Sequence, residues 1–556
     1  TWFGLMREGD VHARVVLRGK GEYAIRVKAA GDQAGPEAPK MAIRWNGADL
    51  KVVEVPERRR EARLHEVRIQ ADRGTHKIAV AYLNNYVNPK EKDPRKRDRN
   101  LLLEFIEIEG PLQPVPQSLP ETHQRIFFTQ PSTKKPAAAA REIIGKFAFN
   151  AWRRPVERAE LDRLMKLFEL GQAQNDSFEK SVKLALQAAM VSPHFLFRGE
   201  LQPEPDNPKQ THLVNEFALA SRLSYFLWST MPDAELLKLA GAGRLRRNLA
   251  GQVERMLKDP KRDALLQNFF TQWLQTRSLQ IAAPDVTTFP AFSPELRRDM
   301  ARETELFVDA IIRENRSLLD LLDADFSYLN GRLAKHYGLE GVEGDEFRRV
   351  SFKDGTRGGI LTQGAVLTIT SNPTRTSPVK RGKWVLENLL AAPPPPPPPN
   401  VPELKIDKEH PLTGTLRERM EQHRANPGCA SCHDRMDAIG FAFENYDAIG
   451  AWRTQEGGAS IDASGELMAG VSFNGPAELK KLLVNQNRDD FIRCVVEKTL
   501  TYALGRGIEH FDRCAVNAIC VKLSQDNYRF STLIQEIVKS APFQKRRGEG
   551  SAPVAP

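Results

Sequence analysis

The chain has 556 residues, 41% of them hydrophobic, and it carries a formal net charge of +10 with a pI near 9.2. This length exceeds what one hydrophobic core organises and predicts several domains, while the apolar fraction excludes a disordered chain. No apolar run reaches the length of about eighteen residues that a membrane-spanning helix needs. The basic charge suits an anionic polysaccharide or an acidic redox partner. Because no nucleic-acid-binding motif accompanies it, we expect no nucleic acid as a partner.

Residues 1–112 alternate apolar and polar side chains in short runs, as in Tyr23, Ile25 and Val27. Gly, Asn and Pro separate these runs. Alternation with a period of two is typical of half-buried strands, so this region is predicted to form a β-sandwich.

A polar loop near the end of this region is bracketed by Asn84-Asn85 and Asp98-Arg99-Asn100. On these residues the region resembles small calcium-dependent carbohydrate-binding modules, and the resemblance implies a polysaccharide ligand and a calcium ion. Calcium prefers several carboxylate, amide and carbonyl oxygens, and the candidate ligands are Asn85, Asp98 and Asn100. Such modules usually carry an Asn-Asp pair where this chain has Asn84-Asn85, so one charge is lost. The alternative is a metal-free sandwich that serves as a spacer.

Residues 113–135 contain several prolines and little periodicity, which predicts a linker. Beyond it, apolar residues recur at helical spacing, as in Ile143 and Phe147. We therefore expect a helical domain over residues 136–200 and a helical bundle over residues 212–340.

The segment Cys429-Ala430-Ser431-Cys432-His433 has the pattern C-x-x-C-H, by which c-type haem is attached. The thiols of Cys429 and Cys432 would add to the vinyl groups of the porphyrin, and His433 would become an axial ligand of the iron. Half a zinc site or a thioredoxin-like dithiol is the alternative, but no second C-x-x-C pair and no βαβ pattern are present. Residues 355–455 are therefore predicted to form a cytochrome-c-like domain.

The second axial ligand of the iron is left open. Met468 lies one compact segment downstream of the motif, and its alternative is an ordinary surface turn. His336 is the long-range candidate, and its alternative is a hydrogen-bonded histidine of the core or of a helix end. Met436 follows His433 by only three residues, so on a helix it would share the face of His433 and is expected to pack against the haem. A different ligand, or none, remains open.

A polar loop from Ser371 to Ser377 precedes a predicted helix, with Ser377 as the N-cap and Pro378 at the first helical position. Arg375 and Arg381 bring cations to this helix start, which suits haem propionates or an anionic substrate. A solvated helix start is the alternative.

The proline run at residues 393–399 predicts a stiff polyproline II segment that serves as a spacer, a surface strap or a recognition ligand. Residues 456–545 are predicted to form a C-terminal helical domain. Within it, Cys494 and Cys514 lie on two predicted helices joined by a turn, which favours a disulfide, with two reduced thiols as the alternative.

The order of these segments resembles the large multidomain cytochrome-c-like proteins of planctomycetes, which are built from domains of unknown function. The motifs that carry the resemblance are FNAWRRP at 149–155, SPHFLFR at 192–198, RLAKHYG at 332–338, GILTQ at 359–363, SNPTRTSPVKRG at 371–382, the proline run, residues 429–447 and LTYALGR at 500–506. Many members have an additional N-terminal haem domain that this chain lacks, so we expect a missing upstream portion.

Covalent haem attachment takes place outside the cytoplasmic membrane, so we expect a periplasmic or extracellular protein whose signal sequence is absent from this chain. The expected function is electron transfer by a c-type haem, coupled to the carbohydrate-binding-like module and served by a redox partner protein. A haem oxidoreductase of peroxidase-like or sugar-oxidising type is one alternative, and it needs an available sixth position on the iron. A structural or assembly protein stabilised by haem is the other.

Overall fold

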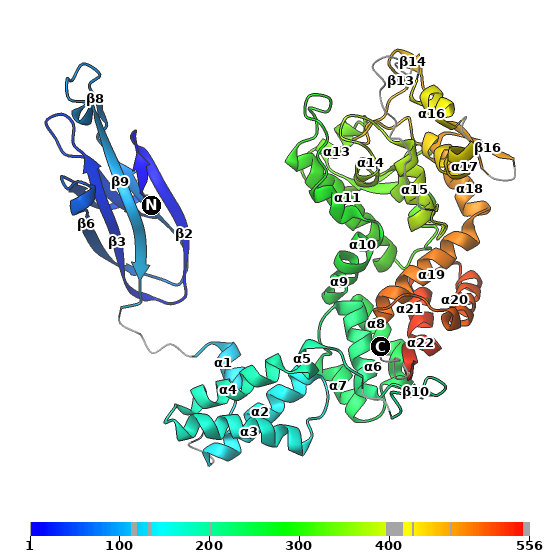
Figure 1. Cartoon of the computed structure of the whole chain (residues 1–556), viewed down its shortest axis with the longest axis horizontal. Helices are drawn as coiled ribbons and strands as arrows, with labels where there is room; N and C mark the ends of the chain where they lie inside the picture. The colour runs from blue at the N-terminus through cyan, green and yellow to red at the C-terminus, as the bar shows by residue number, and fades with distance from the viewer. Residues whose placement is uncertain are drawn as a thin grey trace, which may run out of the picture. The chain divides into compact units, whose positions relative to one another are not determined.

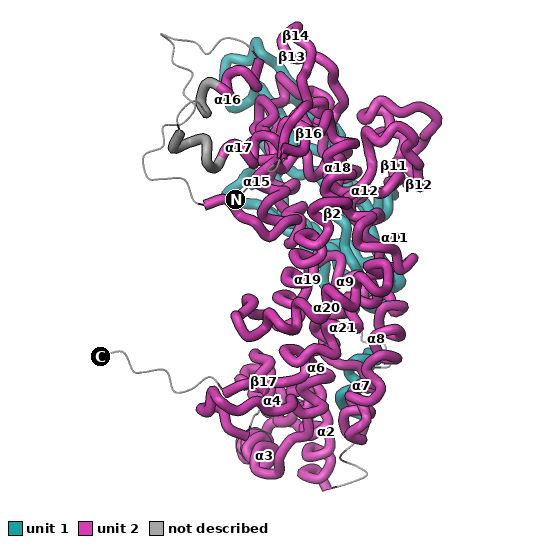
Figure 2. The backbone as a smooth tube through the Cα atoms, turned by 90° about the vertical axis from the view of Figure 1, so that its right-hand side faces the viewer, with its two compact units in different colours: residues 1–128 teal, residues 129–556 magenta. Residues whose placement is uncertain are grey.

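The computed structural model of the chain describes residues 2–112, 119–129, 131, 135–200, 203–395, 415–424, 427–467 and 470–548, apart from the side chains of residues 422–432. The chain divides into two compact units, Thr1–Phe128 (unit 1) and Thr129–Pro556 (unit 2), which Figure 2 distinguishes by colour. Among the described residues, no helix is both long enough and apolar enough to cross a membrane.

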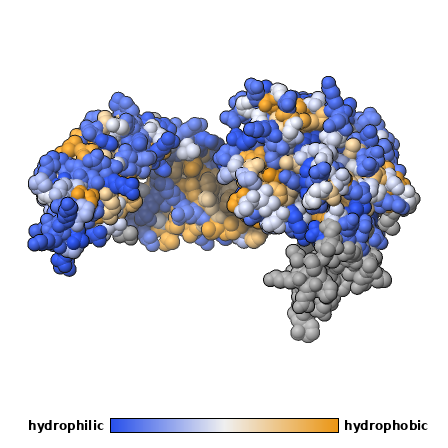
Figure 3. All heavy atoms as spheres, turned by 90° about the horizontal axis from the view of Figure 1, so that it is seen from above, coloured by the Kyte–Doolittle hydropathy of each residue, from blue (hydrophilic) through white to orange (hydrophobic). Residues whose placement is uncertain are grey.

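Unit 1 is a sandwich of two antiparallel sheets, with strand orders β1-β9-β3-β6 and β2-β7-β4-β5 and with β8 paired to β9 (Figure 1). The strands are β1 (Phe3–Leu5), β2 (Gly9–Leu17), β3 (Gly21–Asp32), β4 (Lys40–Trp45), β5 (Ala48–Glu54), β6 (Arg63–Ala71), β7 (Gly74–Tyr82), β8 (Tyr86–Val87) and β9 (Asp98–Glu109). Alternating apolar residues, among them Ile25 and Ile43, form one shared core. The outer surface of this unit in Figure 3 is mostly hydrophilic. The predicted β-sandwich is confirmed.

Unit 2 is mainly helical, as predicted. Its first helices are α2 (Pro136–Trp152), α3 (Arg158–Ala173), α4 (Phe178–Val191) and α5 (Pro193–Leu196). The next are α6 (Glu216–Trp228), α7 (Ala234–Gly241), α8 (Leu249–Lys258), α9 (Asp263–Leu265), α10 (Thr271–Trp273), α11 (Pro294–Arg313), α12 (Asp320–Asp323) and α13 (Gly331–His336). The last are α14 (Gly364–Ile369), α15 (Pro378–Asn388), α16 (Leu416–Arg424), α17 (Pro427–Phe441), α18 (Gly475–Asn485), α19 (Arg488–Leu504), α20 (Arg513–Gln525), α21 (Phe530–Lys539) and α22 (Ala541–Gln544).

Short strand pairs complete unit 2, and all of them are antiparallel. They are β10 (Thr211–Leu213) with β17 (Lys545–Arg547), β11 (Phe326–Leu329) with β12 (Arg348–Ser351), β13 (Gln455–Glu456) with β14 (Ala459–Ser460), and β15 (Ser464–Leu467) with β16 (Val471–Asn474). Within the predicted linker 113–135, residues Glu121–Ile126 form a short helix, α1. The polyproline prediction for 393–399 falls mostly outside the described residues.

One hydrophobic core connects regions of unit 2 that are distant in sequence, because its buried residues run from Val214 to Phe543. Phe226 of α6, for example, lies 6.2 Å from Tyr502 of α19 and 6.0 Å from Phe543 of α22 between ring centroids. The boundaries expected near residues 340 and 455 thus fall within one packed core. The division of unit 2 into separate domains stays a prediction.

The helix that carries the C-x-x-C-H motif, α17, crosses α15 at two glycines. A Cβ atom at Gly382 would lie 1.8 Å from the carbonyl oxygen of Met436, and one at Gly440 would lie 2.0 Å from that of Pro378. Real Cβ atoms do not approach a carbonyl oxygen so closely, so any side chain at these positions would push the helices apart. The two glycines therefore determine how close the motif helix sits to α15.

A buried carboxyl group joins three elements beside this region. Glu303 of α11 accepts hydrogen bonds from the hydroxyls of Ser327 on β11, at 2.7 Å, and of Tyr337, at 2.6 Å. The hydroxyl of Tyr337 in turn accepts from the backbone N–H of Gly364, and the Arg357 guanidinium lies 3.6 Å from the Tyr337 ring centroid. Burial raises the pKa of Glu303 to about 7 despite these donors.

The disulfide favoured between Cys494 and Cys514 is not formed, since both cysteines are free thiols. Cys494 is buried on α19, and its Sγ donates to the carbonyl oxygen of Asn388, at 3.2 Å. Cys514 is exposed on α20. The two helices pack as expected, but only one of the two thiols faces the core.

Candidate functional sites

The C-x-x-C-H motif lies in the N-terminal half of α17, so Cys429, Cys432 and His433 fall on successive turns of one helix. The backbone of α17 is described, but the side chains of both cysteines lie outside the described residues. His433 is the part of the motif whose contacts are visible.

The imidazole of His433 is held by a carboxylate four residues further along α17. Its Nδ1 lies 3.1 and 3.3 Å from the two carboxylate oxygens of Asp437, whose side chain is fully buried. Residues four apart on a helix are neighbours, which explains the pairing. A carboxylate only accepts hydrogen bonds, so Nδ1 carries a proton, and in the neutral imidazole Nε2 then keeps its lone pair. Histidines that ligate a metal usually donate their other ring N–H to a carboxylate, a backbone carbonyl or water, so the residues present fit a haem ligand.

Arg381 anchors the segment that follows α17. Its guanidinium is buried and donates to the carbonyl oxygens of Phe443, Tyr446 and Asp447, at 2.5, 3.0 and 2.8 Å. It also pairs with Glu444, at 3.3 Å. This set of partners leaves little of the guanidinium for a haem propionate, so Arg381 positions the motif helix through the backbone. Arg375 lies exposed on the preceding loop and donates to the carbonyl oxygen of Thr376, at 3.3 Å.

The candidates for the second axial ligand are placed differently. Met436 is buried in the hydrophobic core of unit 2, and its packing against the haem stays a prediction. Met468 lies outside the described residues; β15, which ends at Leu467, is in contact with α17. A Cβ at Gly465 of β15 would lie 2.8 Å from the carbonyl oxygen of Ala438.

His336 ends α13 and is already engaged. Its Nε2 lies 2.8 Å from the carbonyl oxygen of Ile449, and because a carbonyl only accepts, this nitrogen carries the proton. Burial lowers the pKa of His336, which favours the neutral ring. This geometry is that of a hydrogen-bonded helix-end histidine, with Nε2 unavailable to a metal.

The polar end of the sandwich gathers oxygen atoms from two strands. Asp32 of β3 pairs with Asn100 of β9, and the Asn100 amide Nδ2 donates to Asp32 Oδ2, at 3.2 Å. Asp98 lies two residues before Asn100 and so shares its face of β9. Oδ1 of Asp98 and Oδ1 of Asn100 are both buried without a hydrogen-bond partner among the described residues. Two orphaned oxygens beside a carboxylate suit a calcium ion, which takes oxygen ligands alone.

The third predicted calcium ligand, Asn85, is exposed, and its backbone N–H donates to the Glu8 carboxylate, at 3.2 Å. The sequence argument did not single out Asp32 or Glu8, because both are distant in sequence from the polar loop. Asp32 ends β3, and Glu8 stands just before β2. Among the described residues, His, Cys, Asp and Glu side chains form no cluster of three or more that would hold a metal. A calcium site at this end would therefore need the amide oxygen of Asn100 as well as the carboxylates.

Five family models match the chain in order. The first, over residues 24–119, is a calcium-dependent, xylan-binding carbohydrate-binding module, CBM60. The others are described as proteins of unknown function: DUF1595 over 139–200, DUF1592 over 214–339, DUF1588, named PSCyt3, over 357–456, and DUF1585 over 469–543. The motif Cys429–His433 lies inside the PSCyt3 match.

Solved structures similar to part of the chain include the sugar-binding C-terminal domain of EclA, at 18% identity over 20% of this chain and 77% of that one, with a TM-score of 0.16. A family 35 carbohydrate binding module from Clostridium thermocellum matches at 14% identity over 18% of this chain and 69% of that one, with a TM-score of 0.14. No curated protein matches the chain.

Proposed function

We propose that this chain is an extracytoplasmic electron-transfer protein. Its matched families are those of the planctomycete-type multidomain cytochrome-c-like proteins, with a carbohydrate-binding module at the N-terminal end. The observation that carries the proposal is the pairing of His433 with the buried carboxylate of Asp437 directly after a C-x-x-C sequence. A redox partner protein would exchange electrons with it.

Each residue of the haem site has a separate task in this proposal. Cys429 and Cys432 would hold the haem by thioether bonds, and Nε2 of His433 would ligate the iron. The haem supplies one-electron redox chemistry when bound. Asp437 keeps the imidazole in the Nδ1–H tautomer and makes it a stronger electron donor. The anchor made by Arg381 keeps the chain beyond α17 against α15 during turnover.

For the second axial ligand, we favour Met468 over His336. In support, Gly465, three residues before Met468 in sequence, contacts α17 at Ala438, five residues after His433. The Nε2 of His336 already donates to Ile449. Thioether ligation raises the reduction potential and suits electron transfer.

For unit 1, we propose a calcium-dependent polysaccharide site at Asp32, Asp98 and Asn100. The match to a calcium-dependent, xylan-binding module and the two orphaned oxygens support it. The polysaccharide would retain the redox unit near its substrate or partner outside the cell.

The test is a visible absorption spectrum of the purified, haem-loaded chain, oxidised and reduced, with and without carbon monoxide. We expect sharp reduced bands that carbon monoxide leaves unchanged, because two protein ligands fill the axial positions. The double variant Cys429→Ser/Cys432→Ser should lose covalent haem, while Cys514→Ser, at an exposed free thiol, should keep it. Met468→Ala should open the iron to carbon monoxide, and His336→Ala should not.

Two outcomes would count against the proposal. Absence of covalent haem from the unaltered chain would remove its basis. A carbon monoxide shift in the unaltered chain would show an available sixth position and favour a haem oxidoreductase over an electron carrier.

A further inference from the structure

A cavity of about 920 Å³ opens in unit 2 where three of the matched regions meet. Its walls come from the turn after α2, the chain following α5, the start of α6, the turn after α19, and the C-terminal segment around β17. Pairing of β10 with β17 brings the C-terminal segment to this place. Figure 2 shows β17 well apart from α17 along unit 2, and no described residue of α17 lines the cavity, so this cavity is separate from the haem motif.

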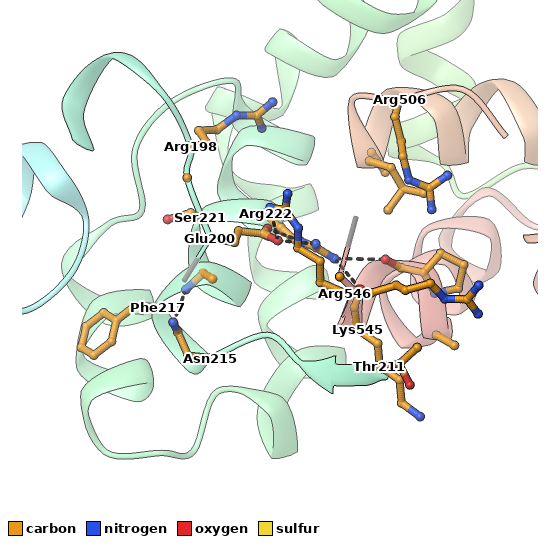
Figure 4. A pocket seen from close by; sticks show the side chains of 18 of the residues that line it. Arg198, Glu200, Thr211, Asn215, Phe217, Ser221, Arg222, Arg506, Lys545 and Arg546 are labelled. Atoms are coloured by element: carbon orange, nitrogen blue, oxygen red, sulfur yellow. Dashed lines mark hydrogen bonds and ion pairs between the residues drawn. The ribbon is translucent and has the colours of Figure 1, made fainter. Parts of the chain in front are cut away.

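Several arginines that line the cavity form ion pairs with carboxylates, and these pairs have a structural role. Arg222 forms a two-pronged pair with Glu200 and also donates to the Phe543 carbonyl oxygen (Figure 4). Arg506 forms a similar pair with the buried carboxylate of Asp512, at 2.6 and 3.1 Å. Such bidentate pairs are directional, so they make the wall rigid.

Other cations of the wall have no carboxylate partner. Within the part of the chain that the structure describes, no carboxylate lies within ion-pair distance of Arg198, Lys545 or Arg547. In Figure 4, Arg198 stands on one side of the cavity and Lys545 on the other. Arg153 also lines the cavity and is buried, and among the described residues it donates only to carbonyl oxygens, including those of His194 and Phe197, at 2.8 and 2.9 Å. A buried cation without a counter-charge raises the positive potential of the cavity.

Aromatic rings hold the uncompensated arginines in place. The Arg198 guanidinium lies 4.9 Å from the ring centroid of Tyr225, and that of Arg547 lies 4.8 Å from the ring centroid of Phe511. Phe511 is 42% exposed, so it offers an apolar face beside the cations. Stacking restricts each side chain before any ligand arrives, which lowers the entropic cost of binding an anion. Glu509, exposed at the rim, offsets only part of this positive charge.

We propose that this cavity binds an anionic oligosaccharide whose carboxylate or sulfate groups pair with Arg198, Lys545 and Arg547. Cations on opposite sides of one cavity suit several anionic groups spread along a ligand better than a single small anion. The volume lies at the upper end of the range for ligand sites, about 300–1,000 Å³. The choice of a saccharide rests on the proposed polysaccharide function of unit 1. The two sites differ in chemistry, because the site of unit 1 needs a calcium ion, whereas the cavity of unit 2 needs its own arginine and lysine side chains.

The experiment is isothermal titration calorimetry on the full-length, haem-loaded chain in EDTA, which disables the calcium-dependent site of unit 1. The probes are a galacturonate tetramer, a sulfated tetrasaccharide, neutral xylotetraose, inorganic sulfate and a short thymidine oligonucleotide. The double variant R198Q/R547Q removes two free cations of the cavity. The matched control R244Q/R247Q removes the same charge from two exposed arginines that do not line it.

We expect at least one anionic tetramer to bind in EDTA and to weaken as salt is added. The cavity variant should weaken that binding by at least about tenfold, since charge-assisted hydrogen bonds are lost, and the control should not. Whichever tetramer binds more tightly identifies carboxylate or sulfate as the preferred group. An unchanged haem spectrum in both variants would show that the fold is retained.

Other outcomes would overturn the proposal. They are no binding of either anionic tetramer, equal losses in cavity variant and control, or tighter binding of inorganic sulfate or of the oligonucleotide. Xylotetraose binding in calcium, measured in parallel, tests unit 1 alone. The failure of one site is therefore distinguishable from the failure of the other.

Discussion

At the scale of single residues, Asp437 is the group through which the fold acts on the proposed iron ligand. The carboxylate is fully buried, and it holds the imidazole at 3.1 Å. A buried negative charge on Nδ1–H makes Nε2 a stronger donor, which stabilises ferric over ferrous iron. With haem bound as proposed, the reduction potential would be set in part by one side chain on the same helix.

Asp437→Asn should raise the midpoint reduction potential of the haem, because an amide still accepts the hydrogen bond but carries no charge. A spectroelectrochemical titration of the variant and the unaltered chain measures the shift. Asp434→Asn is the matched control, since Asp434 is an exposed acid on the same helix. Equal shifts in the two variants would mean that net charge alone, and not the hydrogen bond, sets the potential.

The candidate residues that the sequence identifies are those whose pattern is local, because Cys429, Cys432 and His433 stand within one five-residue segment. Asp437 was not singled out as the partner of His433, although it follows that residue by one helical turn. Asp32 was missed because it meets Asn100 only through the β3–β9 register, 68 residues away in sequence. Arg381 was a candidate for a haem propionate or an anionic substrate, with a solvated helix start as the alternative. The sequence does not show that three carbonyl oxygens beyond α17 converge on its guanidinium.

At the scale of elements, the α15–α17 crossing places the motif helix. Gly382→Ala should destabilise unit 2 by about 3 kcal/mol, because the new Cβ would meet a backbone carbonyl that cannot move without separating the helices. Gly251→Ala is the matched control, since Gly251 is exposed on α8 with nothing near its Cβ position. The control should stabilise the protein by about 0.5–1 kcal/mol. Chemical unfolding followed by circular dichroism compares them, and similar small effects would contradict the tight crossing.

The Glu303 carboxyl connects α11, β11 and the start of α14, and it gives unit 2 a defined pH dependence. Its pKa is about 7 in the folded chain and near 4.5 when exposed. The folded state thus binds the proton more tightly. The contribution of Glu303 to the free energy of unfolding is therefore complete below about pH 4.5 and is lost as the pH rises toward 7. The loss over this window is about 3 kcal/mol at 1.36 kcal/mol per pH unit.

Glu303→Gln should flatten this part of the pH profile, because glutamine keeps the hydrogen bonds to Ser327 and Tyr337 but has no charge to bury. Urea unfolding at intervals between pH 4.5 and 8 measures the slope. Glu305→Gln is the control, because it removes a carboxylate of α11 that pairs with Arg302. This variant should keep the pH dependence of the unaltered chain. A slope that survives in Glu303→Gln would assign the titration to another group.

At the scale of the whole molecule, local patterns predicted the classes of fold but not the extent of the cores. Period-two alternation identified the sandwich, and helical spacing identified the helices of unit 2. That α6, α19 and α22 share one core was not visible, because contacts such as Phe226 to Phe543 join the two ends of unit 2. The disulfide expectation failed for a related reason: helix orientation about its own axis, which buries Cys494 and exposes Cys514, depends on that core.

Because the sandwich core and the core of unit 2 share no residues, the two units should unfold separately. Calorimetry of the full chain should show two transitions, of which calcium raises only the one that belongs to unit 1. At a hundredfold excess over its Kd, calcium would stabilise that unit by about 2.7 kcal/mol, which raises its Tm by roughly 10 °C for a unit of this size.

Asp98→Asn should abolish this calcium-induced rise in Tm, because it removes the negative charge of a carboxylate whose buried Oδ1 has no hydrogen-bond partner among the described residues. Asp93→Asn, at a carboxylate that accepts from the Arg95 backbone N–H, should retain it. A calcium shift in both transitions, or one that survives Asp98→Asn, would place the ion elsewhere.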